Sequence, residues 1–152
     1  MKILYTAKIL VKGGRKGSVQ SEDKRLRMAV RPPVEVGGDP EDKGTNPEEL
    51  FAAAYGSSFR GAMESAARAA HVSLKECLLT CLVHLRETTE GGHQLGIELQ
   101  VNMPGVNHAV AEKILESAHR TCPFSKALRG NAEVKLSMAN SRAKSAALSF
   151  RG

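Results

Sequence analysis

An alanine-rich stretch over residues 46–70 is the feature that most constrains how this chain of 152 residues can fold. Asn46 is a good helix cap, Pro47 suits the first helical position, and Glu49 stands at the capping-box position. Apolar residues nearly encircle the expected helix, as in a helix buried at the centre of a fold. We therefore expect other elements to cover this helix, and Tyr55-Gly56 is the expected point for a break.

Segments in which apolar and polar residues alternate predict strands on both sides of this helix. The expected elements before it are strands over residues 3–11, 18–21 and 26–30, in an antiparallel meander with a glycine turn at 13–17, and an irregular loop over 32–45. Those after it are strands over 72–86 and 95–103, helices over 108–121 and 122–130, and a strand over 134–138. We expect one α+β domain over residues 1–152, with a core at about 3–138 and a frayed tail over 139–152.

Composition excludes several classes of protein. Aromatic residues are 4% of the chain and tryptophan is absent, which leaves little material for stacking on nucleic-acid bases. The net charge of +6 is spread along the chain, which is typical of a solvated surface. No apolar run reaches membrane-spanning length, and Lys8 interrupts the start without a cleavage site for a signal peptide. Three cysteines, an odd number, fit a reducing compartment, so we expect a cytoplasmic protein. From the composition and the absence of a membrane-spanning run, we expect it to bind neither nucleic acid nor membrane.

Cysteine supplies the strongest chemical signal. Cys122 precedes Pro123 at an expected helix start, where unpaired amides and the helix dipole stabilise a thiolate, although a buried inert thiol is an equal alternative. Cys77 and Cys81 share a strand face, so paired redox chemistry is conceivable, but packed free thiols are the favoured interpretation. His84 would point to the opposite face of that strand, so we expect no metal site.

Three motifs in register resemble those of the organic hydroperoxide resistance (Ohr) branch of the OsmC/Ohr family. They are Gly13-Gly14-Arg15, Gly44-Thr45-Asn46-Pro47-Glu48-Glu49-Leu50-Phe51-Ala52-Ala53 and His119-Arg120-Thr121-Cys122-Pro123-Phe124-Ser125-Lys126-Ala127-Leu128-Arg129-Gly130-Asn131. The resemblance covers roughly residues 3–138. It implies an α+β fold in which antiparallel sheets wrap around a long central helix, in an intertwined homodimer.

The resemblance also implies four site roles and a reaction. Ser58 occupies the position of the peroxide-attacking cysteine, and Cys122 is the resolving thiol. Arg15 would hold the attacking sulfur as thiolate, and Glu48 would orient Arg15. The implied activity is reduction of organic hydroperoxides to alcohols, with no bound cofactor and with dihydrolipoamide or a lipoylated protein as reductant. A serine hydroxyl cannot become a sulfenic acid, so we expect the first step to be impaired in this chain.

Helix geometry restricts how these residues can meet. Glu48 and Ser58 are ten residues apart, about 15 Å along a straight helix. A single site therefore requires either a break near Gly56 or a group from a second chain.

Departures from the family pattern leave three functional hypotheses. The chain is a thiol peroxidase whose nucleophile has been replaced by design, or a natural relative that binds a hydrophobic ligand without turning it over, or a protein with a different redox role through Cys122 and Cys77 or Cys81. Arg60 is a further departure, because an apolar or neutral residue is expected two positions after the nucleophile.

Overall fold

The computed structural model describes residues 1–138, and the expected tail over 139–152 lies outside them. The described chain divides into two compact units, Met1–Phe51 and the residues from Ala52 onward. The elements, in order, are β1 (Ile9–Lys12), η1 (Gly14–Lys16), β2 (Ser18–Ser21), β3 (Arg27–Ala29), η2 (Val34–Val36), α1 (Pro47–Ala69), β4 (Leu78–Glu87), β5 (His93–Asn102), α2 (His108–Thr121), α3 (Pro123–Leu128) and β6 (Val134–Met138). The α+β class is confirmed.

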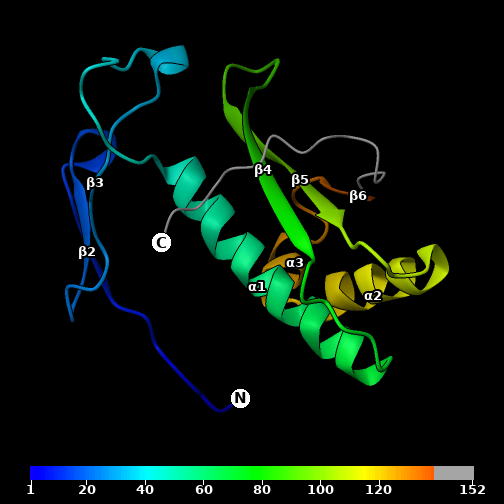
Figure 1. The fold of residues 1–152 in the computed structure, drawn as a ribbon. Coiled ribbons are helices and arrows are strands. Elements are labelled where there is room, and N and C mark those ends of the chain that lie inside the picture. The colour runs from blue at the N-terminus through cyan, green and yellow to red at the C-terminus, as the bar shows by residue number, and fades with distance from the viewer. Residues whose placement is uncertain (139–152) are drawn as a thin grey trace. The chain divides into compact units, whose positions relative to one another are not determined.

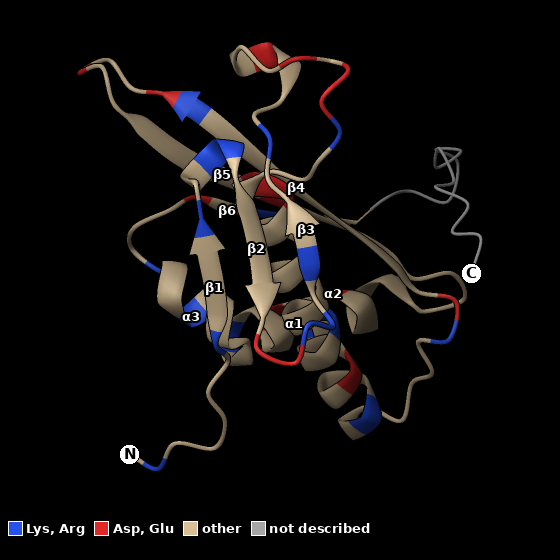
Figure 2. Cartoon of the chain, turned by 90° about the vertical axis from the view of Figure 1, so that its left-hand side faces the viewer, with Lys and Arg blue, Asp and Glu red and all other residues tan. Residues whose placement is uncertain are grey.

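The first unit contains an antiparallel sheet of order β1-β2-β3, which confirms the expected meander. Figure 2 shows the three strands of this sheet side by side, with acidic and basic residues in the turn between β2 and β3. The expected first strand is too long at its start, because residues 3–8 are not strand. Its pairing begins at Ile9, which lies opposite Ser21 at the end of the four-residue β2. Residues 3–8 alternate between apolar and polar side chains, but they pair with no neighbouring strand in the described chain and therefore do not form one.

The long helix α1 follows its local sequence signals at its start. The Asn46 side chain accepts a hydrogen bond from the Glu49 amide at 2.8 Å, while the Glu49 carboxylate accepts one from the Thr45 hydroxyl at 2.9 Å. The expected break at Tyr55-Gly56 is wrong, since α1 is one helix of 23 residues. Gly56 has a packing role instead: a Cβ there would lie 3.3 Å from the Cβ of Cys81 on β4.

The burial of α1 also differs from expectation. The sequence predicts a helix covered on all sides, but in this chain the buried residues follow one stripe: Tyr55, Gly56, Phe59, Met63 and Ala67. Members of this stripe recur every four residues, so they contact the rest of the second unit along a single face. The opposite face, which includes Gly61 and Ser65, is exposed.

The second unit contains a sheet of order β4-β5-β6, and Figure 1 shows β4 and β5 as its long hairpin. β4 and β5 pair antiparallel over ten residues each, but β6 runs parallel to β5, so the expectation of purely antiparallel sheets is wrong. The last connection contains α2 and α3, which is long enough to return the chain to the same end of the sheet. β4 begins later than predicted, because residues 72–77 form a turn and loop. Within residues 1–138, none of the helices is long and apolar enough to cross a lipid bilayer.

The end of α1 carries a backbone conformation that favours glycine. His71 has φ of 55°, and the Val72 amide donates to the Ala67 carbonyl at 2.9 Å, which is a Schellman closure. We expect His71→Gly to raise the free energy of unfolding by about 1 kcal/mol, because glycine avoids the left-handed strain of a Cβ. Urea denaturation followed by circular dichroism would measure the change. Ser73→Gly is the control, and an equal gain from both variants would contradict the prediction.

Candidate functional site

Two residues from distant parts of the second unit meet beside α1. The Ser58 hydroxyl lies 3.5 Å from the Cys122 sulfur, although 64 positions separate them in the sequence. Ser58 is partly exposed on α1, whereas Cys122 is fully buried. The contact is the one that the resemblance implies for an attacking and a resolving residue.

Cys122 occupies the junction between α2 and α3. It is the C-cap of α2 and the N-cap of α3, with Pro123 at the first position, as the sequence predicts. Its backbone is held on both sides: its amide donates to the Ala118 carbonyl at 2.8 Å, and its carbonyl accepts from the Lys126 amide at 3.0 Å. The side chain makes no capping hydrogen bond to α3, so the sulfur is directed to Ser58 and not to the helix end.

Arg15 and Glu48 form a second pair, inside the first unit. Arg15 donates two hydrogen bonds to the two carboxylate oxygens of Glu48, at 2.7 and 3.1 Å. Gly13 and Gly14 adopt φ of 75° and 58°, which lets the chain turn sharply and present Arg15 from η1. Glu48 stands in the first turn of α1, where a negative charge is favourable. The pairing of Arg15 with Glu48 that the resemblance implies is therefore present.

The pair changes the proton affinity of both members. The hydrogen bond to Arg15 lowers the pKa of Glu48, and the hydrogen bond to Glu48 raises the pKa of Arg15. The guanidinium is thus a fixed cation whose orientation the carboxylate sets. It remains half exposed, with 48% of its side chain accessible, so it is available to an anionic group.

The continuous helix α1 keeps Glu48 and Ser58 apart. Ten residues of unbroken helix separate them by about 15 Å along the axis. The first of the two solutions allowed by the sequence, a break at Gly56, is therefore excluded by the fold.

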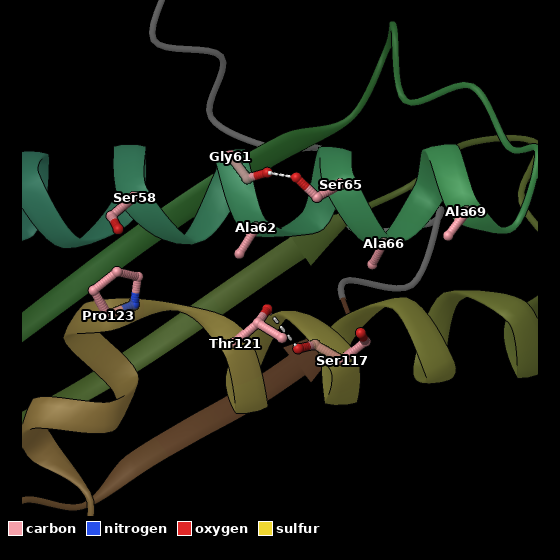
Figure 3. A pocket seen from close by; sticks show the side chains of 9 residues that line it. All are labelled: Ser58, Gly61, Ala62, Ser65, Ala66, Ala69, Ser117, Thr121 and Pro123. Atoms are coloured by element: carbon pink, nitrogen blue, oxygen red, sulfur yellow. Dashed lines mark hydrogen bonds between the residues drawn. The ribbon is translucent and has the colours of Figure 1, made fainter. Parts of the chain in front are cut away.

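A groove of about 420 Å³ begins at Ser58 and follows the exposed face of α1. Small residues dominate its wall: Ser58, Gly61, Ala62, Ser65, Ala66, Ala69, Ser117, Thr121 and Pro123. Figure 3 shows two of its hydroxyls bonded to their own helices, Ser65 to the Gly61 carbonyl at 3.2 Å and Thr121 to the Ser117 carbonyl at 2.9 Å. With those hydroxyls satisfied, the wall presents mainly methyl and methylene groups. No sequence pattern indicates this groove, since its wall comes from three separate helices, α1, α2 and α3.

Comparison with known proteins identifies the family of this chain. Residues 38–137 match the family described as OsmC-like protein. The chain belongs to the OsmC/Ohr family. It is 40% identical over 139 residues to the organic hydroperoxide resistance protein of Xanthomonas axonopodis pv. citri (strain 306), covering 91% of this chain and 96% of that protein.

Solved structures agree. The organic hydroperoxide resistance protein of Elizabethkingia anophelis is 41% identical with a TM-score of 0.84, covering 92% of this chain and 99% of that one. The corresponding protein of Legionella pneumophila is 40% identical with a TM-score of 0.83, covering 91% of this chain and 100% of that one. The OsmC/Ohr-like fold is thus confirmed.

Arg60, unexpected in an Ohr-like chain, does not enter the groove. Its guanidinium donates to the Leu74 carbonyl at 2.8 Å and lies 3.0 Å from the Glu64 carboxylate. It therefore ties the turn after α1 to the helix, on a different side from Ser58. The charge that departs from the family pattern has a structural role here.

The extra cysteines of this OsmC/Ohr chain are placed as packing residues. All three cysteines carry free thiols. Cys77 lies in the loop just before β4 and Cys81 on β4, so the expectation that the two share a strand face is wrong. Burial raises the pKa of Cys77, against an opposing effect of Arg60, and burial raises the pKa of Cys81 to about 11. Among residues 1–138, no group of metal-ligating side chains gathers around His84 or elsewhere.

The thiol of Cys81 should react slowly in the folded protein. With a pKa of about 11 against 9.0 for the ordinary thiol, its thiolate at pH 8 is roughly a hundredfold rarer than in the unfolded chain. We expect iodoacetamide to label Cys81 about a hundredfold more slowly in buffer than in urea. Mass spectrometry of the labelled peptides would measure both rates, and equal rates would contradict the assignment.

The raised pKa also has a consequence for stability. A thiol that is harder to ionise when folded favours the folded state below pH 9, and this contribution is lost as the pH rises towards 11.

Proposed function

We propose that this chain has the scaffold of a thiol-dependent reductase of organic hydroperoxides, in which Ser58 replaces the attacking cysteine. Relatives at about 40% identity bear the name organic hydroperoxide resistance protein, which supports a role in peroxide detoxification. The observation that carries the proposal is the 3.5 Å contact between the Ser58 hydroxyl and the Cys122 sulfur. At this separation a thiol pair at positions 58 and 122 would need little movement to close a disulfide.

The chemistry with a thiol at position 58 has two steps. A thiolate there would attack the distal oxygen of the peroxide and break the O–O bond, leaving a sulfenic acid, and the alkoxide would take up a proton from water and leave as an alcohol. The Cys122 thiol would then attack that sulfur, forming the disulfide and releasing water. A dithiol reductant, dihydrolipoamide or a lipoylated protein, would reopen the disulfide by two thiol exchanges. In this chain the first step lacks its sulfur, so the sequence as it stands should not turn over by this route.

Arg15 and Glu48 would supply the charge in this scheme. The guanidinium would stabilise the thiolate and polarise the peroxide, and Glu48 would keep it oriented through the two hydrogen bonds at 2.7 and 3.1 Å. Because α1 has no break, we propose that an intertwined homodimer completes each site, with Arg15 and Glu48 supplied by the second chain. Free thiols suit a cytoplasmic location for this enzyme.

Exposed apolar surface supports the dimer. In the first unit, Ile9, Val11 and Met28 share one face of the sheet and remain 45%, 61% and 41% exposed. An apolar strand face of this kind is normally covered by another element or another chain. Sedimentation equilibrium would test this, and a monomer at micromolar concentration would contradict the proposal.

A second function, binding of a hydrophobic ligand without turnover, is favoured by the groove. Its wall is largely methyl and methylene, and it reaches Ser58. An acyl chain would fit such a wall, and a serine at its end would leave the ligand unchanged. A third role through Cys122 and Cys77 or Cys81 is disfavoured, since burial raises the pKa of both Cys77 and Cys81.

The test is consumption of cumene hydroperoxide, with dihydrolipoamide as reductant, by the unmodified chain beside its Ser58→Cys variant. We expect activity in the variant alone, at least about a hundredfold above the unmodified chain, because only a thiolate can accept the peroxide oxygen. Activity in both proteins would mean that Cys122 or another cysteine has taken over. A folded Ser58→Cys variant without activity would overturn the reductase proposal in favour of ligand binding.

A further inference from the structure

Tyr55 connects α1 to the segment that carries Cys122. Its hydroxyl lies 2.8 Å from the Ser125 hydroxyl, and both residues are fully buried. Tyr55 precedes Ser58 by three residues on α1, so the two side chains are neighbours on the helix surface. Ser125 follows Cys122 by three residues, in the first turn of α3.

The ring of Tyr55 strengthens the same connection. It stacks on Phe124, with ring centroids 5.8 Å apart and planes at 16°, and it meets the edge of Phe59 at 6.2 Å. Phe124 and Ser125 are consecutive residues, so one side chain holds two neighbours of Cys122. The Lys126 amide in turn donates to the Cys122 carbonyl at 3.0 Å, which makes Cys122 and this first turn of α3 one local unit.

Holding this turn fixes the distance between Cys122 and position 58. The sulfur of Cys122 makes no capping hydrogen bond with its own helix, so its place depends on how α3 sits against α1. The Tyr55–Ser125 hydrogen bond is a buried polar contact between α1 and α3. Loss of the Tyr55 hydroxyl would leave the buried Ser125 hydroxyl without this partner and would loosen the turn.

We propose that Tyr55 is a positioning residue for disulfide closure, acting through Ser125 on Cys122. The inference rests on the proposed function, because closure requires a thiol at position 58. In that step the Cys122 thiol attacks the sulfenic sulfur, an S–S bond forms, the S–O bond breaks, and the thiol proton leaves with the hydroxide as water. Tyr55 does not contact the peroxide in this scheme, so the first step should not depend on its hydroxyl.

The experiment separates the two steps in the Ser58→Cys protein, with and without Tyr55→Phe. One equivalent of cumene hydroperoxide is added, and peroxide loss, dimedone-trapped sulfenic acid and the disulfide to Cys122 are followed by quenched mass spectrometry. We expect unchanged peroxide loss, closure slowed by about tenfold to a hundredfold, and accumulation of the sulfenic acid. A variant that is only less stable would lose both steps together.

Matched controls are available in the chain. Tyr5, the other of its two tyrosines, is 83% exposed, so Tyr5→Phe should leave both steps unchanged. Ser125→Ala should slow closure as Tyr55→Phe does, and the double variant should be no slower than either, since the two hydroxyls act as one unit. Closure at the unmodified rate in a folded Tyr55→Phe protein would overturn the inference.

A second oxidant distinguishes failure of the positioning role of Tyr55 from failure of the proposed reductase function. Diamide oxidises neighbouring thiols without peroxide, so it closes the disulfide even if the Ser58→Cys protein cannot reduce a hydroperoxide. We expect Tyr55→Phe to slow diamide closure by about tenfold as well. Unchanged diamide closure would overturn the positioning role, whatever the peroxide assay shows.

Discussion

Oxidation of the Ser58→Cys protein should raise its free energy of unfolding by about 4 kcal/mol over the reduced form, since a bridge to Cys122 would close a loop of 64 residues. The Ser58 hydroxyl already lies 3.5 Å from the Cys122 sulfur, so little movement is needed to form the bond. The gain comes mainly from the lost freedom of the unfolded chain, which grows with loop length. Urea denaturation with and without dithiothreitol would measure it.

The control for this prediction is Ser58→Cys combined with Cys122→Ser, which cannot form the bridge. Its stability should not respond to dithiothreitol. Equal stability of the oxidised and reduced Ser58→Cys proteins, or a bridge to Cys77 or Cys81 found by peptide mapping, would contradict the geometry described for the site.

The second large effect is expected at Gly17, which closes the turn that presents Arg15. A Cβ on Gly17 would lie 1.7 Å from the Lys12 carbonyl oxygen and 2.7 Å from the Gly13 alpha carbon. Backbone atoms cannot yield as a flexible side chain would, so the end of β1 and the turn must move. We expect Gly17→Ala to lower the free energy of unfolding by at least about 3 kcal/mol. Urea denaturation followed by circular dichroism would show the loss.

Gly14→Ala serves as the comparison within the same turn. Gly14 has φ of 58° but open space around it, so its substitution should cost about 1 kcal/mol of backbone strain and no clash. Equal losses from the two variants would mean that strain, and not the close approach of Lys12, governs this turn.

Local signals in the sequence predicted the helices well. The start of α1 was predicted from Asn46 and Pro47, because caps and fixed dihedrals act within one turn, and α2 spans the predicted residues 108–121. The prediction of a break at Gly56 was wrong because a glycine in a helix can either allow a break or allow another element to pack closely. Only the tertiary contact with Cys81 shows that Gly56 serves close packing. The parallel pairing of β6 with β5 also depends on tertiary contacts that no local pattern contains.

The site was predictable only in part. The motifs placed Arg15 beside Glu48 and Ser58 near Cys122 through the resemblance, since residues 33 and 64 positions apart have no local reason to meet. Tyr55 was noted only as the point of an expected break, although a tyrosine among small residues of a buried helix usually needs a partner for its hydroxyl. Its partner, Ser125, lies 70 positions away. Distance along the chain is thus what concealed this contact.

Two hydroxyls in the groove donate to backbone carbonyls of their own helices, so the polarity of the groove wall can change with side-chain rotation. Ser65 and Thr121 each lie on a helix, and a single rotation about χ1 turns the hydroxyl from the carbonyl four residues earlier toward the groove. In an empty groove these oxygens can bind water, and when an alkyl chain enters they can return to the backbone without losing a hydrogen bond. Filling the groove therefore removes water at little polar cost, a property that a wall of alanine or of asparagine could not combine.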